Sequence, residues 1–367
     1  MQSDEMVRTP DRYEIITDHN KFLSLKRHWD DLYESSAERD LIQSFEWCRC
    51  SWELMAKPQR RRLNCLVVWQ RDRAVLIWPF VTYGRLPTFA RPLGPETSEY
   101  SSVLVEGGSE ADRRVLTAWA ILRKNLRADK ILLPYIKSGS LLHRAIVASK
   151  VASRPVMLWP TPYVSWDGYQ DWDSYYRFLK GEFRHSLRRT RRRLAEKGNL
   201  TFERINDRDR FPVILDWIFQ RKTDWLARIN EKSVWRETDL YRNFLIAAQT
   251  QMPEQIQSFI LKLNDEIISA VLCRISKLRV ECVIATFDPA YSKYGPGQLL
   301  YEDILKWAFE RRLDCDFRLG NQLYKQYWTN STSEAVTYQF VNSLRGAAFV
   351  RLKDALLSVR RTVIRPV

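Results

Sequence analysis

Residues 286–300 read Thr286-Phe287-Asp288-Pro289-Ala290-Tyr291-Ser292-Lys293-Tyr294-Gly295-Pro296-Gly297-Gln298-Leu299-Leu300, and this is the most informative segment of the chain. It predicts an apolar strand that passes through a glycine-rich corner directly into an amphipathic helix, with Pro296 in the first helical turn. Gly295 and Gly297 let a ligand approach the backbone, where a helix start leaves N–H groups free and the helix dipole adds partial positive charge. The corner therefore predicts an anion site, with phosphate or pyrophosphate as the expected ligand.

The segments around this corner predict a mixed sheet. Residues 280–287 are apolar on both faces, as in a buried strand, and a further strand follows the helix at 314–319. Such a strand, helix, strand unit should have a right-handed crossover. Upstream, strands at 256–263 and 267–275 flank a turn at 264–266, and a second turn at 276–278 leads into the next strand. The predicted fold class is α/β, with an α+β mixed sheet in which an antiparallel meander feeds one helical crossover.

This order of elements resembles the GCN5-related N-acetyltransferase (GNAT) fold, in which the pyrophosphate of acyl-CoA sits at the corner. Within that fold the chain resembles the CelD/BcsL branch, which is found with cellulose and exopolysaccharide genes. The motifs that carry this resemblance are Phe287-Asp288-Pro289, Tyr294-Gly295-Pro296-Gly297, Asp316-Phe317-Arg318-Leu319-Gly320, Tyr324-Lys325-Gln326-Tyr327-Trp328, and the arginine-rich segment 183–194 followed by Gly198. The similarity is densest over residues 163–330. Two departures are Ser292, where the GNAT signature has Gln or Arg, and Pro296, which removes one amide from the corner.

The resemblance implies a co-substrate and a reaction. Acetyl-CoA, or another acyl-CoA, is expected at the corner, and no metal is implied. The residues expected to hold it are Tyr294, Gly295, Gly297 and Gln298. A GNAT transfers the acyl group directly from thioester to amine, so it needs a base for the ammonium proton and an acid for the leaving thiolate. Tyr324 lies just past the strand that ends at Gly320, where this fold usually offers a tyrosine to the CoA sulfur, and it is the candidate acid.

Three carboxylates, Glu281, Asp288 and Asp316, are candidate bases. Asp288 stands at the strand end before Pro289, where capping the turn is an alternative role. Glu281 interrupts an otherwise apolar strand, which is costly unless its carboxylate is paired or reaches a cleft. The histidines at 19, 28 and 143 are scattered and suggest no set of metal ligands.

Composition predicts a globular protein of two domains. The chain has 367 residues, and this length exceeds the size at which a single hydrophobic core stops growing. Of these residues 45% are hydrophobic and 13% are aromatic, which is enough for two globular domains. The six cysteines form no CxxC pair and mostly lie in apolar runs, so we expect reduced core thiols without zinc or disulfides. No apolar run approaches about 20 residues and Met1–Pro10 is polar, so neither a transmembrane helix nor a signal peptide is predicted, and the expected location is the cytoplasm.

A repeat in the order of elements predicts two tandem GNAT-like domains. Three features recur at nearly constant spacing. A strand followed by a helix begins near 13 and again near 201, a hairpin turn lies near 72 and again near 265, and a late strand lies near 131 and again near 315. The first copy has only Gly107-Gly108 at its crossover, which suggests a degenerate domain over 11–160. The second, over 161–345, should carry the acyl-CoA corner, and 346–367 a helical tail. The boundary is expected in the proline-rich stretch 154–166.

Positive charge is concentrated on one predicted helix. The net charge is +15, and six arginines fall between 184 and 193, beside an apolar stripe of Phe183, Leu187, Thr190 and Leu194 at helical spacing. A solvated face is the plain interpretation. The functional interpretations are an anionic saccharide or lipid-linked acceptor, an anionic membrane surface touched peripherally, or nucleic acid. Nucleic acid comes last because no nucleic-acid-binding motif accompanies the charge.

We favour an anionic acceptor, and the candidate substrate-binding residues are Arg184, Arg188 and Lys325. The predicted function is transfer of an acyl group, most simply acetyl, from acyl-CoA to an amine of a saccharide or cell-envelope precursor. Two alternatives stay open. A tandem GNAT pair is also the layout of FemABX-type aminoacyl transferases, whose charged tRNA would suit the positive charge. The chain could also be a non-catalytic module of a polysaccharide-synthesis complex, a reading that the Ser292 and Pro296 departures favour.

Overall fold

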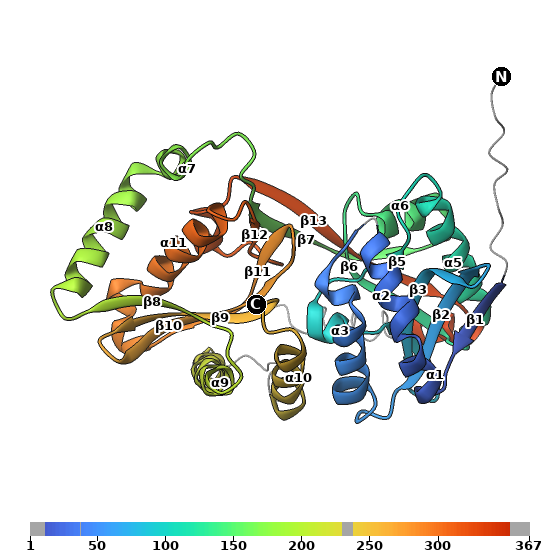
Figure 1. The fold of residues 1–367 in the computed structure, drawn as a ribbon. Helices are drawn as coiled ribbons and strands as arrows, with labels where there is room; N and C mark the ends of the chain where they lie inside the picture. The colour runs from blue at the N-terminus through green and yellow to red at the C-terminus, as the bar shows by residue number, and fades with distance from the viewer. Residues whose placement is uncertain (1–11, 37, 230–237, 353–367) are drawn as a thin grey trace, which may run out of the picture. The chain divides into compact units, whose positions relative to one another are not determined.

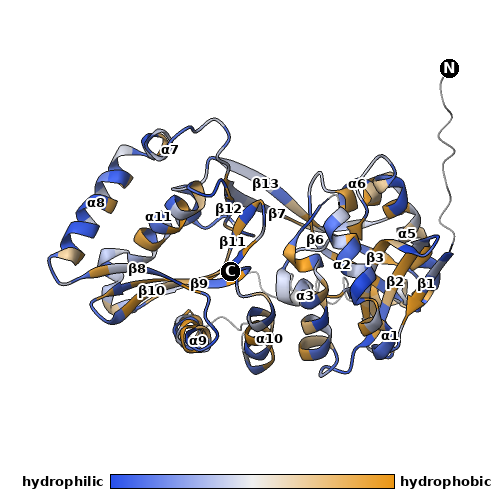
Figure 2. Cartoon of the chain, viewed as in Figure 1, coloured by the Kyte–Doolittle hydropathy of each residue, from blue (hydrophilic) through white to orange (hydrophobic). Residues whose placement is uncertain are grey.

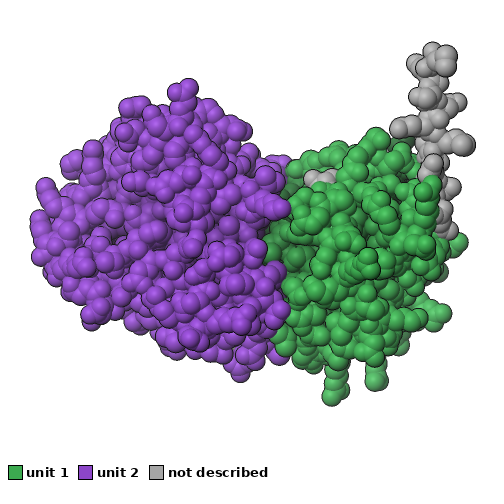
Figure 3. Space-filling model, viewed as in Figure 1, with its two compact units in different colours: residues 1–158, 335–367 green, residues 159–334 purple. Residues whose placement is uncertain are grey.

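The computed structural model describes residues 12–36, 38–229 and 238–352. The chain divides into two compact units, one formed by residues 1–158 and 335–367 and the other by 159–334 (Figures 1 and 3). The chain leaves unit 1 within strand β7 (Arg154–Val164) and re-enters it within β13 (Ser331–Val341). The domain ranges 11–160, 161–345 and 346–367 were predicted from a repeated pattern rather than from contacts, and they stay a prediction. Of the predicted tail, residues 353–367 lie outside the described part of the chain.

Unit 1 is a mixed sheet between two hydrophobic cores. Its strands follow the order β1-β2-β3-β4-β6-β13, with β5 beside β3, and β4 and β6 run parallel. Alternate residues of β2 point to opposite faces, so that Cys65 and Val67 join one core and Leu66 and Val68 the other. The strands are β1 (Arg12–Ile16), β2 (Arg62–Gln70), β3 (Arg73–Tyr83), β4 (Phe89–Pro92), β5 (Leu104–Val105) and β6 (Lys130–Lys137). The helices are α1 (His19–Ser24), α2 (Lys26–Ser35), α3 (Phe45–Cys50), α4 (Pro95–Ser98), α5 (Ala111–Asn125) and α6 (Leu141–Ala148).

Unit 2 repeats this plan. Its strands follow the order β7-β12-β11-β10-β9-β8, in which β8 to β11 form an antiparallel meander and β11 and β12 run parallel. Helix α11 packs on one face of the sheet and α9 on the other, and α8 lies along α11 (Figure 1). The strands are β8 (Leu200–Ile205), β9 (Ile256–Leu263), β10 (Glu266–Ile275), β11 (Arg279–Phe287) and β12 (Asp314–Asp316). The helices are α7 (Trp172–Phe178), α8 (Gly181–Ala195), α9 (Arg210–Arg228), α10 (Thr238–Gln251), α11 (Pro296–Phe309) and α12 (Leu323–Gln326).

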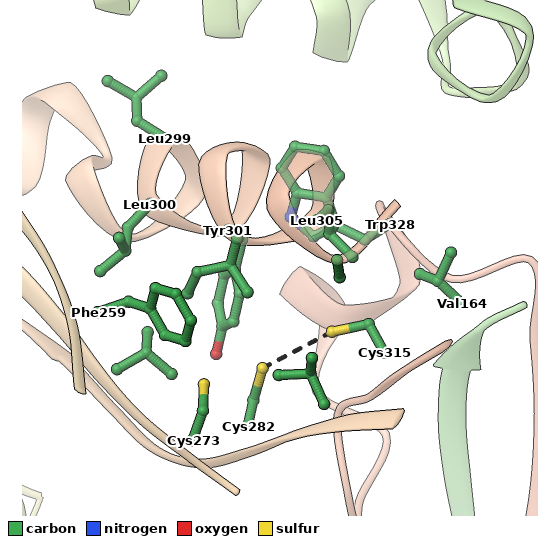
Figure 4. Packing of buried hydrophobic residues seen from close by; sticks show 14 of the residues in the cluster. Val164, Phe259, Cys273, Cys282, Leu299, Leu300, Tyr301, Leu305, Cys315 and Trp328 are labelled. Atoms are coloured by element: carbon green, nitrogen blue, oxygen red, sulfur yellow. Dashed lines mark hydrogen bonds between the residues drawn. The ribbon is translucent and has the colours of Figure 1, made fainter. Parts of the chain in front are cut away.

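Helix α11 is held by one apolar face. Leu300, Ile304 and Ala308 recur at helical spacing and are fully buried against the strands of the meander. The cysteines of this unit, Cys273, Cys282 and Cys315, lie beneath the helix in the same core (Figure 4). All six cysteines of the chain are buried and free, so the prediction that they are core residues is confirmed.

The predicted mixed α/β fold is confirmed. The turn predicted at 264–266 lies at 264–265, the strand predicted at 280–287 is Arg279–Phe287, and the helix begins at Pro296 as predicted. Both units have a first strand, helices, an antiparallel meander, a crossover helix (α5 or α11) and a parallel strand (β6 or β12), which confirms the repeated order. The strand predicted at 314–319 is shorter and ends at Asp316. Within the described residues, every helix is too short or too polar to cross a lipid bilayer.

Candidate functional site

The corner between β11 and α11 is shaped by a capped turn and a glycine. Asp288 Oδ1 accepts a hydrogen bond from Ala290 N at 2.9 Å and caps a 3₁₀ turn over Pro289–Tyr294, while Oδ2 accepts from Arg221 Nη2 of α9 at 2.6 Å. Gly295 then adopts φ 53° and ψ 51°, a left-handed conformation that suits glycine, and Pro296 begins α11 at once. Asp288 thus has the turn-capping position that its sequence context offered.

The backbone of this corner is open to a ligand. A Cβ added to Gly295 would meet nothing within 4 Å, and one added to Gly297 would lie 3.8 Å from Phe287 Cδ1 and 4.0 Å from Ser269 Oγ. Packing therefore does not require glycine at 297. The Gly297 amide belongs to the first turn of a 14-residue helix, where N–H groups have no partner within the helix and the dipole is positive. These residues fit the phosphate groups of an acyl-CoA.

The two side chains predicted to assist the corner have different surroundings. Gln298 Oε1 accepts a hydrogen bond from Trp328 Nε1 at 2.6 Å, which ties the first turn of α11 to the segment after α12. Tyr294 is half-buried against the core of unit 2, and the ammonium groups of Lys293 and Lys197 lie 5.2 and 6.0 Å from its ring centroid. Tyr294 therefore lies at the open side of the corner, whereas Gln298 holds the first turn of α11 to the segment after α12.

The sheet opens beside this corner. Strands β11 and β12 pair at only three positions, the last being Glu281 with Asp316, whereas β11 continues to Phe287. On its other edge, β11 pairs Ile284 with Leu272 but Cys282 with Cys273, so Val283 forms a bulge. A bulge leaves its residue outside the regular ladder and often lies next to an active site. The second half of β11 thus offers backbone groups to a ligand where β12 has ended.

Tyr324 lies under α11 and is paired with a second tyrosine. Its ring stacks on Tyr301 of α11 at a centroid distance of 5.7 Å, and the two hydroxyls share a hydrogen bond. Burial raises the pKa of Tyr324 above its usual value of 10, although the bond to Tyr301 acts in the opposite direction. Figure 4 shows that Tyr301 points toward Cys273 and Cys282. The Tyr324 phenol is therefore protonated at neutral pH, as a general acid must be.

Lys325, Asp316 and Arg318 form a buried polar group just past β12. The Lys325 ammonium donates to the carbonyls of Leu319 at 2.6 Å and Arg318 at 3.4 Å, and the residue is only 4% exposed. Asp316 Oδ1 accepts from Arg318 N at 2.7 Å, and Arg318 Nη1 donates to Val283 O at 3.4 Å. Arg318 therefore spans from the end of β12 to the bulge in β11.

Glu281 forms an ion pair with Arg274, its partner across β10 and β11. The two side chains are 4% and 3% exposed, so the pair is enclosed in the protein. A carboxylate in an apolar strand was expected to be paired or to reach a cleft. Glu281 is paired.

The arginine-rich helix α8 is both attached and solvated. Leu187 and Leu194 are buried, and Phe183 stacks on Tyr327 and packs edge-on against Trp328 at centroid distances of 4.9 and 4.8 Å. Arg191 Nη2 reaches Glu302 and Asp303 of α11 at 2.7 and 2.9 Å. Of the candidate substrate-binding arginines, Arg184 is half-buried and Arg188 is exposed. Figure 2 shows the rest of α8 as largely hydrophilic.

The structure brings some predicted site residues together and separates others. Tyr294, Gly295 and Gly297 form the corner, while Asp316 ends β12, where the sheet opens, and Tyr324 follows in α12. Sequence reasoning missed Tyr301 and Arg318, although both could have been noticed. Tyr301 is four residues after Gly297 on the buried face of the helix, and Arg318 lies inside the motif Asp316-Phe317-Arg318-Leu319-Gly320. Among the residues that the structure describes, no cluster of His, Cys, Asp and Glu could hold a metal ion.

Comparison with known proteins gives one family match and several structural neighbours. Residues 181–326 match a family model described as an acetyltransferase (GNAT) domain. No curated protein sequence matches the chain significantly.

Several solved structures share the fold over almost the whole chain. FemX aligns with a TM-score of 0.61 and 13% identity, covering 90% of this chain and 97% of that one. L-PGS from Bacillus licheniformis aligns with a TM-score of 0.52 and 11% identity, covering 92% and 97%. A tandem GNAT protein from the clavulanic acid biosynthesis pathway aligns with a TM-score of 0.50 and 12% identity, covering 90% and 99%. Residues 181–326 are thus similar to a GNAT acetyltransferase domain, and the chain as a whole has a tandem GNAT-like fold.

Proposed function

We propose that this chain transfers an acyl group, most simply acetyl, from acyl-CoA to an amine of a saccharide or cell-envelope precursor in the cytoplasm. The observation that carries the proposal is the open corner at Gly295–Gly297, which lies at the positive end of α11 beside the half of β11 that β12 does not pair. Tyr294, Gly295, Gly297 and Gln298 would hold the acyl-CoA. The co-substrate would supply an activated thioester.

In this proposal Tyr324 is the acid, because burial keeps its phenol protonated. The three candidate bases each have a partner within the protein. Asp288 caps its turn and pairs with Arg221, and Glu281 pairs with Arg274. We retain Asp316 as the proposed base, since it ends β12 where the two strands diverge.

The acceptor is proposed from charge and from the resemblance to the CelD/BcsL branch. Arg184 and Arg188 lie on the first half of α8, close to where Phe183 contacts the segment after α12. An anionic saccharide or lipid-linked acceptor would be attracted to these arginines, and a peripheral contact with an anionic membrane would use the same surface. Lys325 is a weaker candidate, because its ammonium is already bonded to two carbonyls.

A second candidate is aminoacyl transfer from charged tRNA, which the FemABX resemblance implies. The alignment of FemX with 90% of this chain and the net charge of +15 favour it. A non-catalytic role in a polysaccharide-synthesis complex would leave the fold intact and the corner empty of acyl-CoA.

Calorimetric titration with acetyl-CoA tests the proposal. Wild type should bind, and Gly297→Val should bind at least tenfold more weakly, because its methyl groups fill the space over the corner amide beside Phe287 and Ser269. Gly181→Val, at the first turn of α8, is the matched control and should bind like wild type. Equal affinity in Gly297→Val would remove acyl-CoA from this corner. No binding by wild type would leave charged tRNA or a non-catalytic role.

A further inference from the structure

We infer that the C-terminal end of α8 and the turn before Gly295 form a second anion site, which recognises the 3′-phosphate of CoA. The site is an open pocket of about 480 Å³, lined by Arg193, Glu196, Lys197, Lys293 and Tyr294. This inference rests on the proposed function, since it concerns the same co-substrate. It adds side-chain recognition of a phosphomonoester to the backbone recognition offered by the corner.

Charge is the first argument for an anionic ligand. Three of the five lining residues are cations and one is a carboxylate. That carboxylate, Glu196, lies 3.7 Å from Arg192 Nε, which offsets its negative charge. The ammonium groups of Lys197 and Lys293 are both within 6.0 Å of the Tyr294 ring centroid. Cations that converge on one pocket repel each other, and a bound dianion would relieve that repulsion.

The support beneath the pocket is the second argument. Lys197 is the second residue after α8, and this end of the helix is fixed by the buried Leu194. Arg191 holds the same part of α8 to α11 through Glu302 and Asp303. The basic side chains therefore project from a helix whose position relative to the corner is set by packing and ion pairs. The end of α8 and the turn before Gly295 are therefore held in place before a ligand binds.

The position of the pocket identifies the ligand. Lys293 and Tyr294 line it, and the next residue is Gly295 of the corner, so two anion sites lie side by side. CoA carries a pyrophosphate and a phosphomonoester on the 5′ and 3′ oxygens of one ribose. The corner, with backbone amides at a helix start, suits the pyrophosphate, and the pocket, with Arg and Lys side chains, suits the dianionic monoester. 3′-Dephospho-CoA has only the first of these groups.

The test compares CoA with 3′-dephospho-CoA by calorimetry at one fixed ionic strength. Wild type should bind CoA at least about tenfold more tightly, as expected for charge-assisted hydrogen bonds. In Lys197→Gln/Lys293→Gln, the affinity for CoA should fall to that for 3′-dephospho-CoA, which should itself stay the same. The control Lys180→Gln/Arg189→Gln removes two exposed charges from the same region of unit 2 but none from the pocket, and it should keep the preference.

Adenosine 3′,5′-bisphosphate and AMP provide a second pair of ligands without a thioester, and the same preference for the 3′-phosphate is expected. Equal affinity of wild type for CoA and 3′-dephospho-CoA would overturn this inference and leave the proposed function standing. A preference that survives in Lys197→Gln/Lys293→Gln would place the 3′-phosphate elsewhere and also overturn it. Failure of wild type to bind either form of CoA would overturn both.

Discussion

Replacing Glu281 by glutamine tests whether the Glu281 carboxylate has a structural or a catalytic role. Glu281 and Arg274 lie opposite each other on β11 and β10, form an ion pair, and are 4% and 3% exposed. Glutamine keeps the shape of the side chain but leaves the Arg274 guanidinium buried without its counter-charge. Removing one partner of a buried pair typically costs about 3–5 kcal/mol. For a unit the size of residues 159–334, each kcal/mol lowers the melting temperature by about 2–4 °C, so we expect a drop of roughly 6–20 °C.

The assay is differential scanning calorimetry together with urea unfolding. Arg274→Met/Glu281→Gln removes both charges and should recover much of the stability lost in Glu281→Gln alone, because no uncompensated charge is left buried. Glu203→Gln on β8 is the matched control. It breaks ion pairs with Arg210 and Lys262 at a half-exposed site, where the expected cost is at most about 1 kcal/mol. If Glu281→Gln unfolds like wild type but loses turnover, the structural reasoning is refuted and Glu281 becomes the base.

Two further predictions concern turnover and pH. Tyr324→Phe should lower kcat by about 10²-fold or more with little change in the affinity for acetyl-CoA, because only the proton donor is lost; equal losses in both would remove Tyr324 as the acid. Burial lowers the pKa of His143 below 6.5, and its Nδ1 accepts a hydrogen bond from Gly139 N at 3.3 Å. The unfolded chain therefore binds this proton more readily, so the free energy of unfolding should be highest above pH 6.5 and fall as the pH drops through 6.5 toward the lower folded pKa. Urea unfolding between about pH 5 and 8 should show this slope weakened in His143→Gln, and an unchanged slope would assign it to other groups.

The fold was predictable because its signals are local. The corner is marked by Gly295, Pro296 and Gly297, and the flanking strand and helix each have their own hydrophobic period. The strand predicted at 314–319 ends earlier, at Asp316, for a reason that the sequence does not show. Phe317 N donates to Pro162 O, and Arg318 adopts a φ of 62°, so after Asp316 the chain stays bonded to β7 but no longer pairs with β11.

The site was predicted only in part, because its remaining contacts join distant segments. The bond between Trp328 and Gln298 and the ion pairs of Arg191 with α11 depend on how α8, α11 and α12 pack. The pairing of Glu281 with Arg274 follows from the register of one hairpin, which is set at the turn, where Ile275 pairs with Val280, and which holds as far as the bulge at Val283. A one-residue shift changes which side chains face each other, so this partner could not be read from residue type alone.

The early end of β12 explains why cations are buried beside the opening in the sheet. Once the strand stops at Asp316, the carbonyl of Val283 has no ladder partner from β12, and the carbonyls of Arg318 and Leu319 have none from β11. Buried carbonyls need donors, and Arg318 Nη1 and Lys325 Nζ supply them. These side chains supply the hydrogen bonds that the backbone of a longer strand would otherwise supply. The opening beside β11 is thus compatible with a stable core, because the donors that its carbonyls require come from side chains.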